Sequence, residues 1–352
     1  MNKKLAMFPM TREQCATARY SDLMSGYSLS YCLVPDFRHI EGADISQIDG
    51  GDFVDINVYS YSTGKLQACD VIFLDYDTRL PEIDLYKSVL DDAAKFGVEV
   101  VLSRALEAEM GMSSDVASTT VERVFNTLYE IDCPVVTVLT QGERTDQFAV
   151  ELALRKYFTE AGYSVSQLSS YKAGIFFDIP NVPDFIREPG DTFDKIVGFN
   201  HYVKDLTDRE QPELMIIGVP DAILKYNDRV LQGLGIIPYI ICTAVESDAP
   251  VFCMHHASYN QEYFDNMSLH FLHKYGSEAT IFNIANCGIV PDAGMEGEEL
   301  DYFDIPSDFV LHSINDMEHE GYEIFNVLNS KSAIALAMAV ETALAGNVRS
   351  IR

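Results

Sequence analysis

The chain has 352 residues, of which 47% are hydrophobic, and its 54 acidic and 25 basic side chains give a formal net charge of −29. This charge argues against binding to nucleic-acid backbones or anionic membrane surfaces, because both need clustered cations. A basic peptide or protein would instead be steered toward the chain. The length is sufficient for two domains of ordinary size, each with its own hydrophobic core.

The N-terminal apolar run stops at Pro9, which is too short for the core of a signal peptide. No stretch approaches the roughly 20 apolar residues of a membrane span, so the chain is expected to be cytoplasmic. Its seven cysteines are scattered, without a CxxC pair. We therefore expect most of them to be buried thiols rather than disulfides or zinc ligands.

The first third of the chain alternates between strand and helix patterns, which predicts a Rossmann-like domain with a parallel sheet. The first strand-to-helix turn, at residues 9–13, has no G-x-G-x-x-G, which argues against a dinucleotide site there. A helix at 116–131 is expected to end this domain, so the predicted domains are 1–132 and 133–352. The predicted strands are 4–8, 28–34, 53–59, 68–74 and 98–102, and the other predicted helices are 13–25 and 81–96.

The second domain is predicted to be a doubly wound α/β domain resembling a degenerate phosphate-loop NTPase. It begins with a β-strand, turn, α-helix, β-strand pattern at 134–139, 147–161 and 163–168. The proline-rich, acidic segment 176–190 is expected to be a surface loop, and the acidic segment 295–304 is expected to be a solvated loop. Further predicted strands are 214–218, 250–256, 279–285 and 323–328, and further predicted helices are 193–206 with Asp191 as cap, 239–245, 261–275 and 331–345, the last closed by Gly346.

The turn after the first strand of this domain is the candidate site, because such turns form the phosphate-binding loops of related folds. A working phosphate loop needs several glycines and a lysine, whereas this turn has one glycine and a single cation. Two interpretations stay open: a helix N-terminus capped by Asp146, or a degenerate nucleotide-binding pocket. The candidate residues are Gly142, Glu143, Arg144, Thr145, Asp146 and Gln147.

No other pattern assigns a catalytic residue or a metal site. His255 and His256 end a predicted strand and therefore point to opposite faces, which argues against a shared metal ion. His270 and His273 lie one helical turn apart, but histidines at such spacing are more often structural. Neither a G-x-S-x-G nor an H-E-x-x-H motif is present, so serine-nucleophile and metalloprotease chemistry have no support.

Several motifs resemble those of the peptide maturation system proteins, which are bacterial accessory proteins encoded beside radical SAM enzymes and short precursor peptides. They are Lys4-Leu-Ala-Met-Phe-Pro9, Val138-Leu-Thr-Gln-Gly-Glu-Arg-Thr-Asp-Gln-Phe148, Gly162-Tyr-Ser-Val-Ser-Gln167, Ile217-Gly-Val-Pro220 and Gly233-Leu-Gly-Ile-Ile-Pro-Tyr239. The resemblance implies an accessory protein in the maturation of a ribosomally made peptide. Its implied partners are the precursor peptide and the radical SAM maturase.

A looser similarity is to bacterial proteins that join a Rossmann-like domain to a phosphate-loop NTPase-like domain, some of which are amino-acid N-acyltransferases. In such proteins the central turn carries a lysine before the phenylalanine, whereas this chain has Gln147 before Phe148. The similarity implies an alternative function, a nucleotide- or acyl-CoA-dependent transferase or ligase that uses the central turn.

The alanine-rich last helix suits packing on a sheet or on a second copy in a homo-oligomer.

Overall fold

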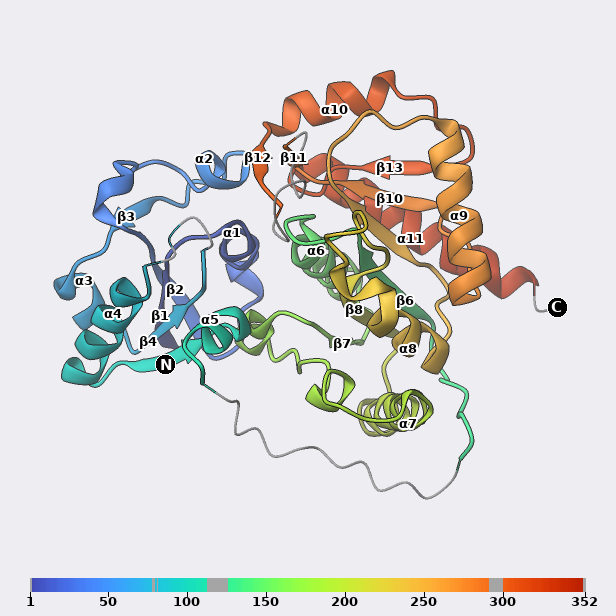
Figure 1. The fold of residues 1–352 in the computed structure, drawn as a ribbon, viewed down its shortest axis with the longest axis horizontal. Helices are drawn as coiled ribbons and strands as arrows, with labels where there is room; N and C mark the ends of the chain where they lie inside the picture. The colour runs from blue at the N-terminus through green and yellow to red at the C-terminus, as the bar shows by residue number, and fades with distance from the viewer. Residues whose placement is uncertain (1, 78–79, 81, 113–125, 291–299, 351–352) are drawn as a thin grey trace. The chain divides into compact units, whose positions relative to one another are not determined.

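The structure is a computed structural model that describes residues 2–77, 80, 82–112, 126–290 and 300–350 (Figure 1). The chain forms two compact units, one of residues 1–117 with 171–181 and the other of residues 118–170 with 182–352. The chain thus returns to the first unit after it has begun the second. The domain limits of 1–132 and 133–352 do not include this return, and they stay a prediction.

The described part of the first unit is a five-stranded parallel sheet in the order β3-β2-β1-β4-β5, with helices on its faces. Its strands are short apolar runs, which is typical of parallel strands covered on both faces. The elements are β1 (Lys3–Phe8), α1 (Arg12–Arg19), η1 (Ser21–Leu23), β2 (Tyr27–Val34), η2 (Asp36–Arg38), α2 (Ser46–Asp49), β3 (Val58–Ser60), α3 (Thr63–Gln67), β4 (Val71–Leu74), α4 (Ile83–Phe96), β5 (Glu99–Leu102), α5 (Arg104–Glu109) and η3 (Lys172–Phe177).

The described part of the second unit is built on a six-stranded parallel sheet in the order β13-β10-β9-β6-β8-β7. Its elements are β6 (Val135–Thr140), α6 (Gln147–Glu160), β7 (Val165–Leu168), η4 (Asp184–Ile186), α7 (Thr192–Glu210), β8 (Leu214–Ala222), η5 (Gln232–Gly235), α8 (Ile236–Ala244), β9 (Val251–Met254), α9 (Gln261–Tyr275), β10 (Ile281–Ile284), β11 (Cys287–Ile289), β12 (Tyr302–Asp304), α10 (Ser307–Asp316), β13 (Glu323–Phe325) and α11 (Ser330–Ser350).

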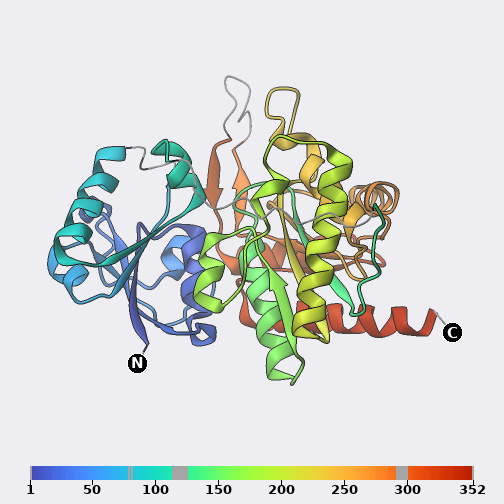
Figure 2. The same cartoon turned by 90° about the horizontal axis from the view of Figure 1, so that it is seen from below.

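Strand β6 lies at the centre of the second sheet, and the direction of winding reverses beside it. The chain leaves β6 toward β8 and β7, and then continues from β8 to β9 and β10 on the other side. Helix α11 packs beside α6, as Figure 2 shows, while α7 packs against α8 and α8 against α9. The carboxyl ends of β6 and β9 therefore lie at the topological switch point, the place where open α/β sheets bind ligands.

The predicted fold class, two mostly parallel α/β sheets with helices, is confirmed. All seven cysteines are free, and only Cys133 among them is not buried. Among the described residues, no helix is long and apolar enough to cross a membrane. Most predicted elements occur within a few residues of their expected positions, and Asp191 caps α7 by accepting hydrogen bonds from the backbone of Phe193 and Asp194.

Segment 176–190 is a surface loop only at residues 187–190, which are exposed, whereas most of residues 176–186 are buried or half-buried, so the prediction was wrong for them. The ring of Phe176 packs edge-on against Tyr27 and Phe73, at centroid distances of 5.0 and 5.5 Å. Ile179 and Ile186 are each only 1% exposed. The segment contains only the end of η3 and the short helix η4, and the apolar side chains among its prolines anchor it in the core.

Three other predictions differ from the structure near the ends of elements. Residues 126–131 are not helical, and residues 116–125 of the helix predicted at 116–131 lie outside the described residues. Helix α11 continues past Gly346 to Ser350, because glycine lowers helix stability without forbidding a helix. Residues 295–299 of the acidic segment 295–304 lie outside the described residues, and residues 302–304 form strand β12, which pairs with β11 in an antiparallel manner.

The turn η5 is left-handed over four residues, with φ of 47° at Gln232, 71° at Gly233, 57° at Leu234 and 68° at Gly235. A Cβ at Gly235 would lie 2.1 Å from the backbone oxygen of Ile223. We expect Gly235→Ala to lower the free energy of unfolding by about 3 kcal/mol, because the strained φ and the collision both add to the cost.

The matched control for this prediction is Gly276→Ala at the end of α9. Gly276 has a similar φ of +87°, but a Cβ there would meet nothing within 4 Å. Its substitution should cost about 1 kcal/mol, from backbone strain alone. Urea titration followed by circular dichroism measures both variants, and equal losses would contradict the role of the Ile223 contact.

Candidate functional site

The central turn lies between β6 and α6, and two threonine hydroxyls hold its shape. The Thr140 hydroxyl accepts a hydrogen bond from the Gly142 backbone N–H at 3.0 Å and donates to the Gly142 carbonyl. The hydroxyls of Thr140 and Thr145 are 2.6 Å apart. Thr145 is 1% exposed, so its hydroxyl fixes the turn from inside instead of facing a ligand.

Gln147 stands about where a phosphate loop would carry its lysine, but its side chain points back into the sheet. It is 2% exposed, and its amide donates to the backbone oxygens of Val138 and Val219, each at 2.8 Å. These carbonyls belong to β6 and β8 near the shift in their pairing register, which lies between Val138 and Thr140. Gln147 therefore joins two strands where their ladder is irregular, which is a structural role.

Arg144 is the only cation of the turn, and strand β12 holds it. Its guanidinium lies 5.3 Å from the ring centre of Tyr302 and 3.7 Å from the Asp304 carboxylate. The side chain is only 15% exposed. A ligand that binds Arg144 must therefore compete with the ring of Tyr302 and the carboxylate of Asp304.

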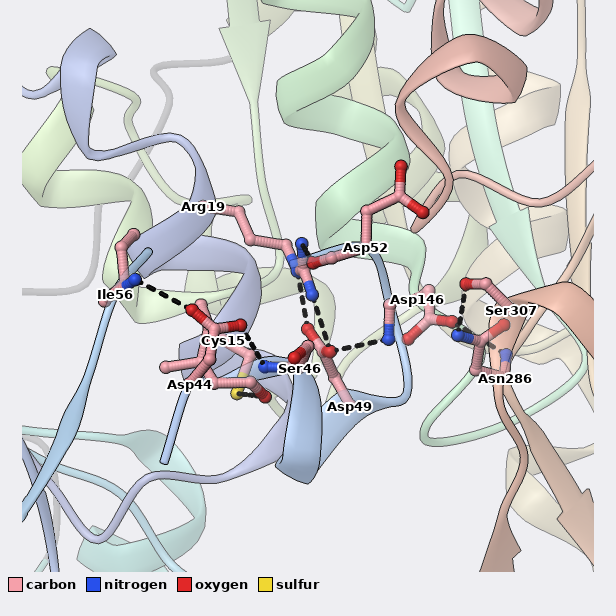
Figure 3. Close-up of polar contacts among 12 residues, drawn as sticks. Cys15, Arg19, Asp44, Ser46, Asp49, Asp52, Ile56, Asp146, Asn286 and Ser307 are labelled. Atoms are coloured by element: carbon pink, nitrogen blue, oxygen red, sulfur yellow. Dashed lines mark hydrogen bonds and ion pairs between the residues drawn. The ribbon is translucent and has the colours of Figure 1, made fainter. Parts of the chain in front are cut away.

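Asp146 occupies the N-cap position of α6 but does not cap the helix, which corrects the prediction. Its backbone is left-handed with φ 60°, and its side chain makes no capping bond. The carboxylate instead accepts from the backbone N–H of Asn286 at 3.2 Å, and the Asn286 amide donates to the Ser307 hydroxyl at 2.7 Å (Figure 3). Asp146 thus connects the central turn to the segment between β10 and β11.

His255, at the end of β9, is the residue that the sequence analysis did not connect with this turn. Its Nε2 lies 2.7 Å from the Glu143 backbone oxygen, and its backbone N–H donates to the Gln141 side chain at 3.0 Å. The imidazole also stacks on Tyr302, with ring centres 5.5 Å apart. The signal that could have placed it is its position at the carboxyl end of a strand next to β6.

Two side chains approach Gly142 closely. A Cβ there would lie 2.8 Å from the terminal amide of Gln232 and 3.3 Å from Cε1 of His255. With its amide in the orientation that satisfies its neighbours, Gln232 donates to the backbone oxygens of Gln141 and Leu224, each at 3.2 Å. The space over the central glycine is thus filled by η5 and β9.

All six predicted site residues lie together at the central turn, where they contact other residues of the protein. Glu143 and Thr145 contribute backbone oxygens, to His255 and to the Asn283 amide respectively. The described residues contain no group of three or more histidines, cysteines, aspartates or glutamates that could hold a metal ion.

Burial lowers the pKa of His256 and also that of His270, where the nearby charge of Lys274 adds to the effect.

A second polar cluster, which the sequence analysis missed, lies at the carboxyl edge of the first unit's sheet. Asp75 follows β4 and accepts a hydrogen bond from the Thr11 hydroxyl at 2.7 Å. Burial and the charge of Glu13 raise its pKa to about 6, although hydrogen bonds from Thr11, Ser103 and the Tyr76 backbone oppose the shift. Asp75 can therefore change protonation near neutral pH.

The class that fold and site define is a two-unit α/β protein with a central turn at the switch point of its second sheet. No family model and no curated protein matches the chain in sequence. Among solved structures, a DUF1611 family protein from Anabaena variabilis is 12% identical with a TM-score of 0.57, and the match covers 96% of this chain and 99% of that one. The chain therefore has a DUF1611-like α/β fold.

A pseudomurein peptide ligase type C from Methanothermus fervidus shows a partial likeness. It is 11% identical with a TM-score of 0.25, and the match covers 71% of this chain and 38% of that one. These values are too low for a conclusion about fold or activity.

Proposed function

We propose that the chain is a binding protein, an accessory factor that binds a precursor peptide during the maturation of a ribosomally made peptide and works with a radical SAM maturase. The observation that carries the binding role is the side chain of Gln147, which bridges β6 and β8 where a phosphate loop would present a lysine. The choice of a precursor peptide and a radical SAM maturase as partners rests on the resemblance of the sequence motifs to the peptide maturation system proteins.

The charge of the chain supports a peptide as the ligand. A formal net charge of −29 attracts basic segments over several ångströms and accelerates their encounter with the protein. Such attraction is screened by salt, because the Debye length falls from about 30 Å at 0.01 M to about 3 Å at 1 M ionic strength. Peptide affinity should therefore fall as the salt concentration rises.

The alternative is a nucleotide- or acyl-CoA-dependent transferase or ligase that uses the central turn. Its support is the position of the turn at the topological switch point, beside His255. In that case Arg144 is the residue expected to bind the phosphates, after exchanging Asp304 for the ligand.

Isothermal titration calorimetry separates the two functions. The ligands are ATP, GTP and acetyl-CoA, each with magnesium, and a short precursor peptide of the kind that the family resemblance implies, with a scrambled peptide of equal composition as control. The proteins are the wild type, Arg144→Ala, and Arg209→Ala as a control at an exposed arginine of α7. We expect the unscrambled peptide to bind all three proteins and the nucleotides to bind none.

Binding of a nucleotide or acetyl-CoA that is lost only in Arg144→Ala would overturn the accessory role and locate an enzyme site at the turn. Equal affinity for the unscrambled and scrambled peptides would also contradict the proposal, because it would show charge attraction without recognition.

A further inference from the structure

Strands β11 and β12 form a small antiparallel sheet that is separate from the six-stranded sheet (Figure 1). Two further backbone hydrogen bonds, each of 2.9 Å, extend their pairing. The Val290 N–H donates to the Asp301 carbonyl, and the Ile305 N–H donates to the Asn286 carbonyl. Among the described strands, β12 pairs only with β11, so its other edge is unpaired. A three-residue edge strand adds little stability by itself, and a strand of another chain can take such a place.

Two side chains of β12 contact Arg144 of the central turn. Tyr302 and Asp304 are two residues apart and therefore lie on the same face of the strand. The Tyr302 ring contacts both the Arg144 guanidinium and the His255 imidazole, with its centre 5.3 and 5.5 Å away. The Asp304 carboxylate lies 3.7 Å from the same guanidinium. One face of β12 thus presents an aromatic ring and a carboxylate to the central turn.

The contact between β12 and Arg144 leaves the donors of the guanidinium unused. A guanidinium has five N–H donors, but that of Arg144 makes no hydrogen bond with any described residue. Its distance to the Asp304 carboxylate exceeds the roughly 2.8 Å of a charge-assisted hydrogen bond. The Arg144 side chain is only 15% exposed. Arg144 can therefore hold a carboxylate that approaches more closely than that of Asp304.

The middle residue of β12, Phe303, lies over a glycine of β11. Gly288 is the partner of Phe303 in the pairing register. A Cβ at Gly288 would lie 2.4 Å from Cζ of the Phe303 ring, so any larger residue there would displace the ring. Gly288 therefore leaves a space on β11 for an apolar side chain of the paired strand.

On the basis of the peptide-binding role proposed above, we propose that β12 is an internal copy of the segment by which the peptide ligand is recognised, and that the ligand replaces β12 on β11. The ligand segment is extended and has the order aromatic, apolar, acidic. Its aromatic ring packs on His255 and Arg144, its apolar side chain lies over Gly288, and its carboxylate binds Arg144. Pairing with β11 supplies main-chain hydrogen bonds, and the three side-chain positions supply specificity.

A free peptide must compete with β12, which the chain holds next to β11. A tethered segment has an effective concentration of about 1 mM or more, so it weakens the apparent affinity of any free competitor. Substituting alanine for both Tyr302 and Asp304 removes the side-chain contacts of β12 with the central turn. The same change leaves β11, Arg144 and His255 intact, so the double variant should accept a peptide more readily than the wild type.

Fluorescence anisotropy with a labelled peptide of residues 300–306, at high salt to screen general charge repulsion, measures this competition. We expect Tyr302→Ala with Asp304→Ala to bind the peptide about tenfold more tightly than the wild type does. A scrambled peptide should bind neither protein. The matched control is Tyr226→Ala with Asp228→Ala, an exposed aromatic and acidic pair of equal spacing outside the hairpin, which should bind like the wild type.

A second comparison tests the carboxylate position. Arg144→Ala in the double variant should weaken binding about tenfold without abolishing it, because the pairing with β11 remains. A peptide with asparagine in place of the residue that corresponds to Asp304 should lose the same factor. The two losses should not add, because both remove one interaction.

No binding of the peptide to the double variant, equal affinity of the wild type and the double variant, or additive losses would each overturn the role of β12. The peptide-binding role would still stand in that case if the precursor peptide, but not its scrambled form, binds in the calorimetric titration. The two proposals can therefore fail separately.

Discussion

Glu151→Gln is expected to stabilise the protein by about 4 kcal/mol at pH 8, although a carboxylic acid and an amide have nearly the same shape. Glu151 lies on α6 and is fully buried, and burial raises its pKa to about 8 against opposing hydrogen bonds from Ser169 and Gln167. Its Oε1 has no hydrogen-bond partner among the described residues. Between pH 4.5 and about pH 8, Glu151 is therefore mostly protonated in the folded state and mostly ionised in the unfolded state.

The sign of the pH dependence follows from this difference. The pKa of Glu151 is higher in the folded than in the unfolded state. Its contribution to the free energy of unfolding is therefore fully present below pH 4.5 and is lost as pH rises toward 8. Glutamine does not titrate, so the stability advantage of the variant should grow by about 3 kcal/mol between pH 5.5 and pH 8.

Urea titration at both pH values measures this change, with Glu160→Gln at the exposed end of α6 as control. The Glu160 side chain is 65% exposed, so its substitution should give nearly the same small effect at both pH values. An advantage of Glu151→Gln that does not change with pH would mean that the buried carboxyl is not the source of the linkage.

Glu151 also illustrates what the sequence can predict. The stretch from Gln147 to Leu154 is buried without interruption, and a helix with no polar face is typical of one covered on all sides. That pattern could have marked the single glutamate within it. What the sequence does not show is that Gly218 of β8 lies against this side chain, where a Cβ would lie 2.0 Å from a carboxyl oxygen of Glu151.

The central turn likewise has a part that local sequence patterns predict and a part that depends on tertiary contacts. Its position was predicted correctly, because strand, turn and helix are contiguous and each has a local pattern. The partners of Arg144 and Asp146 come from β12 and from the segment after β10, so their engagement depends on tertiary contacts. Strand β12 itself was hidden in an acidic segment, where charge is a stronger local signal than a three-residue strand.

Arg19→Ala is expected to destabilise the first unit by about 3–5 kcal/mol, the cost of leaving a buried charge without its partner. Arg19 and Asp49 are 7% and 1% exposed and form a two-pronged pair at 2.6 and 2.7 Å (Figure 3). The guanidinium also donates to the backbone oxygen of Asp52 at 2.8 Å. Arg19 therefore ties α1 to the segment that follows α2.

The double variant Arg19→Met with Asp49→Leu distinguishes the loss of the pair from the exposure of one member. Replacing both charged residues with apolar residues leaves no unpaired charge, so the free energy of unfolding of the double variant should lie within about 1–2 kcal/mol of that of the wild type. Arg209→Ala is the control, because its pair with Asp205 is 63% and 69% exposed and solvent screens it. A double variant as unstable as Arg19→Ala would show that the backbone hydrogen bonds, from Arg19 to Asp52 and from Gly51 to Asp49, and not the ion pair, hold the segment.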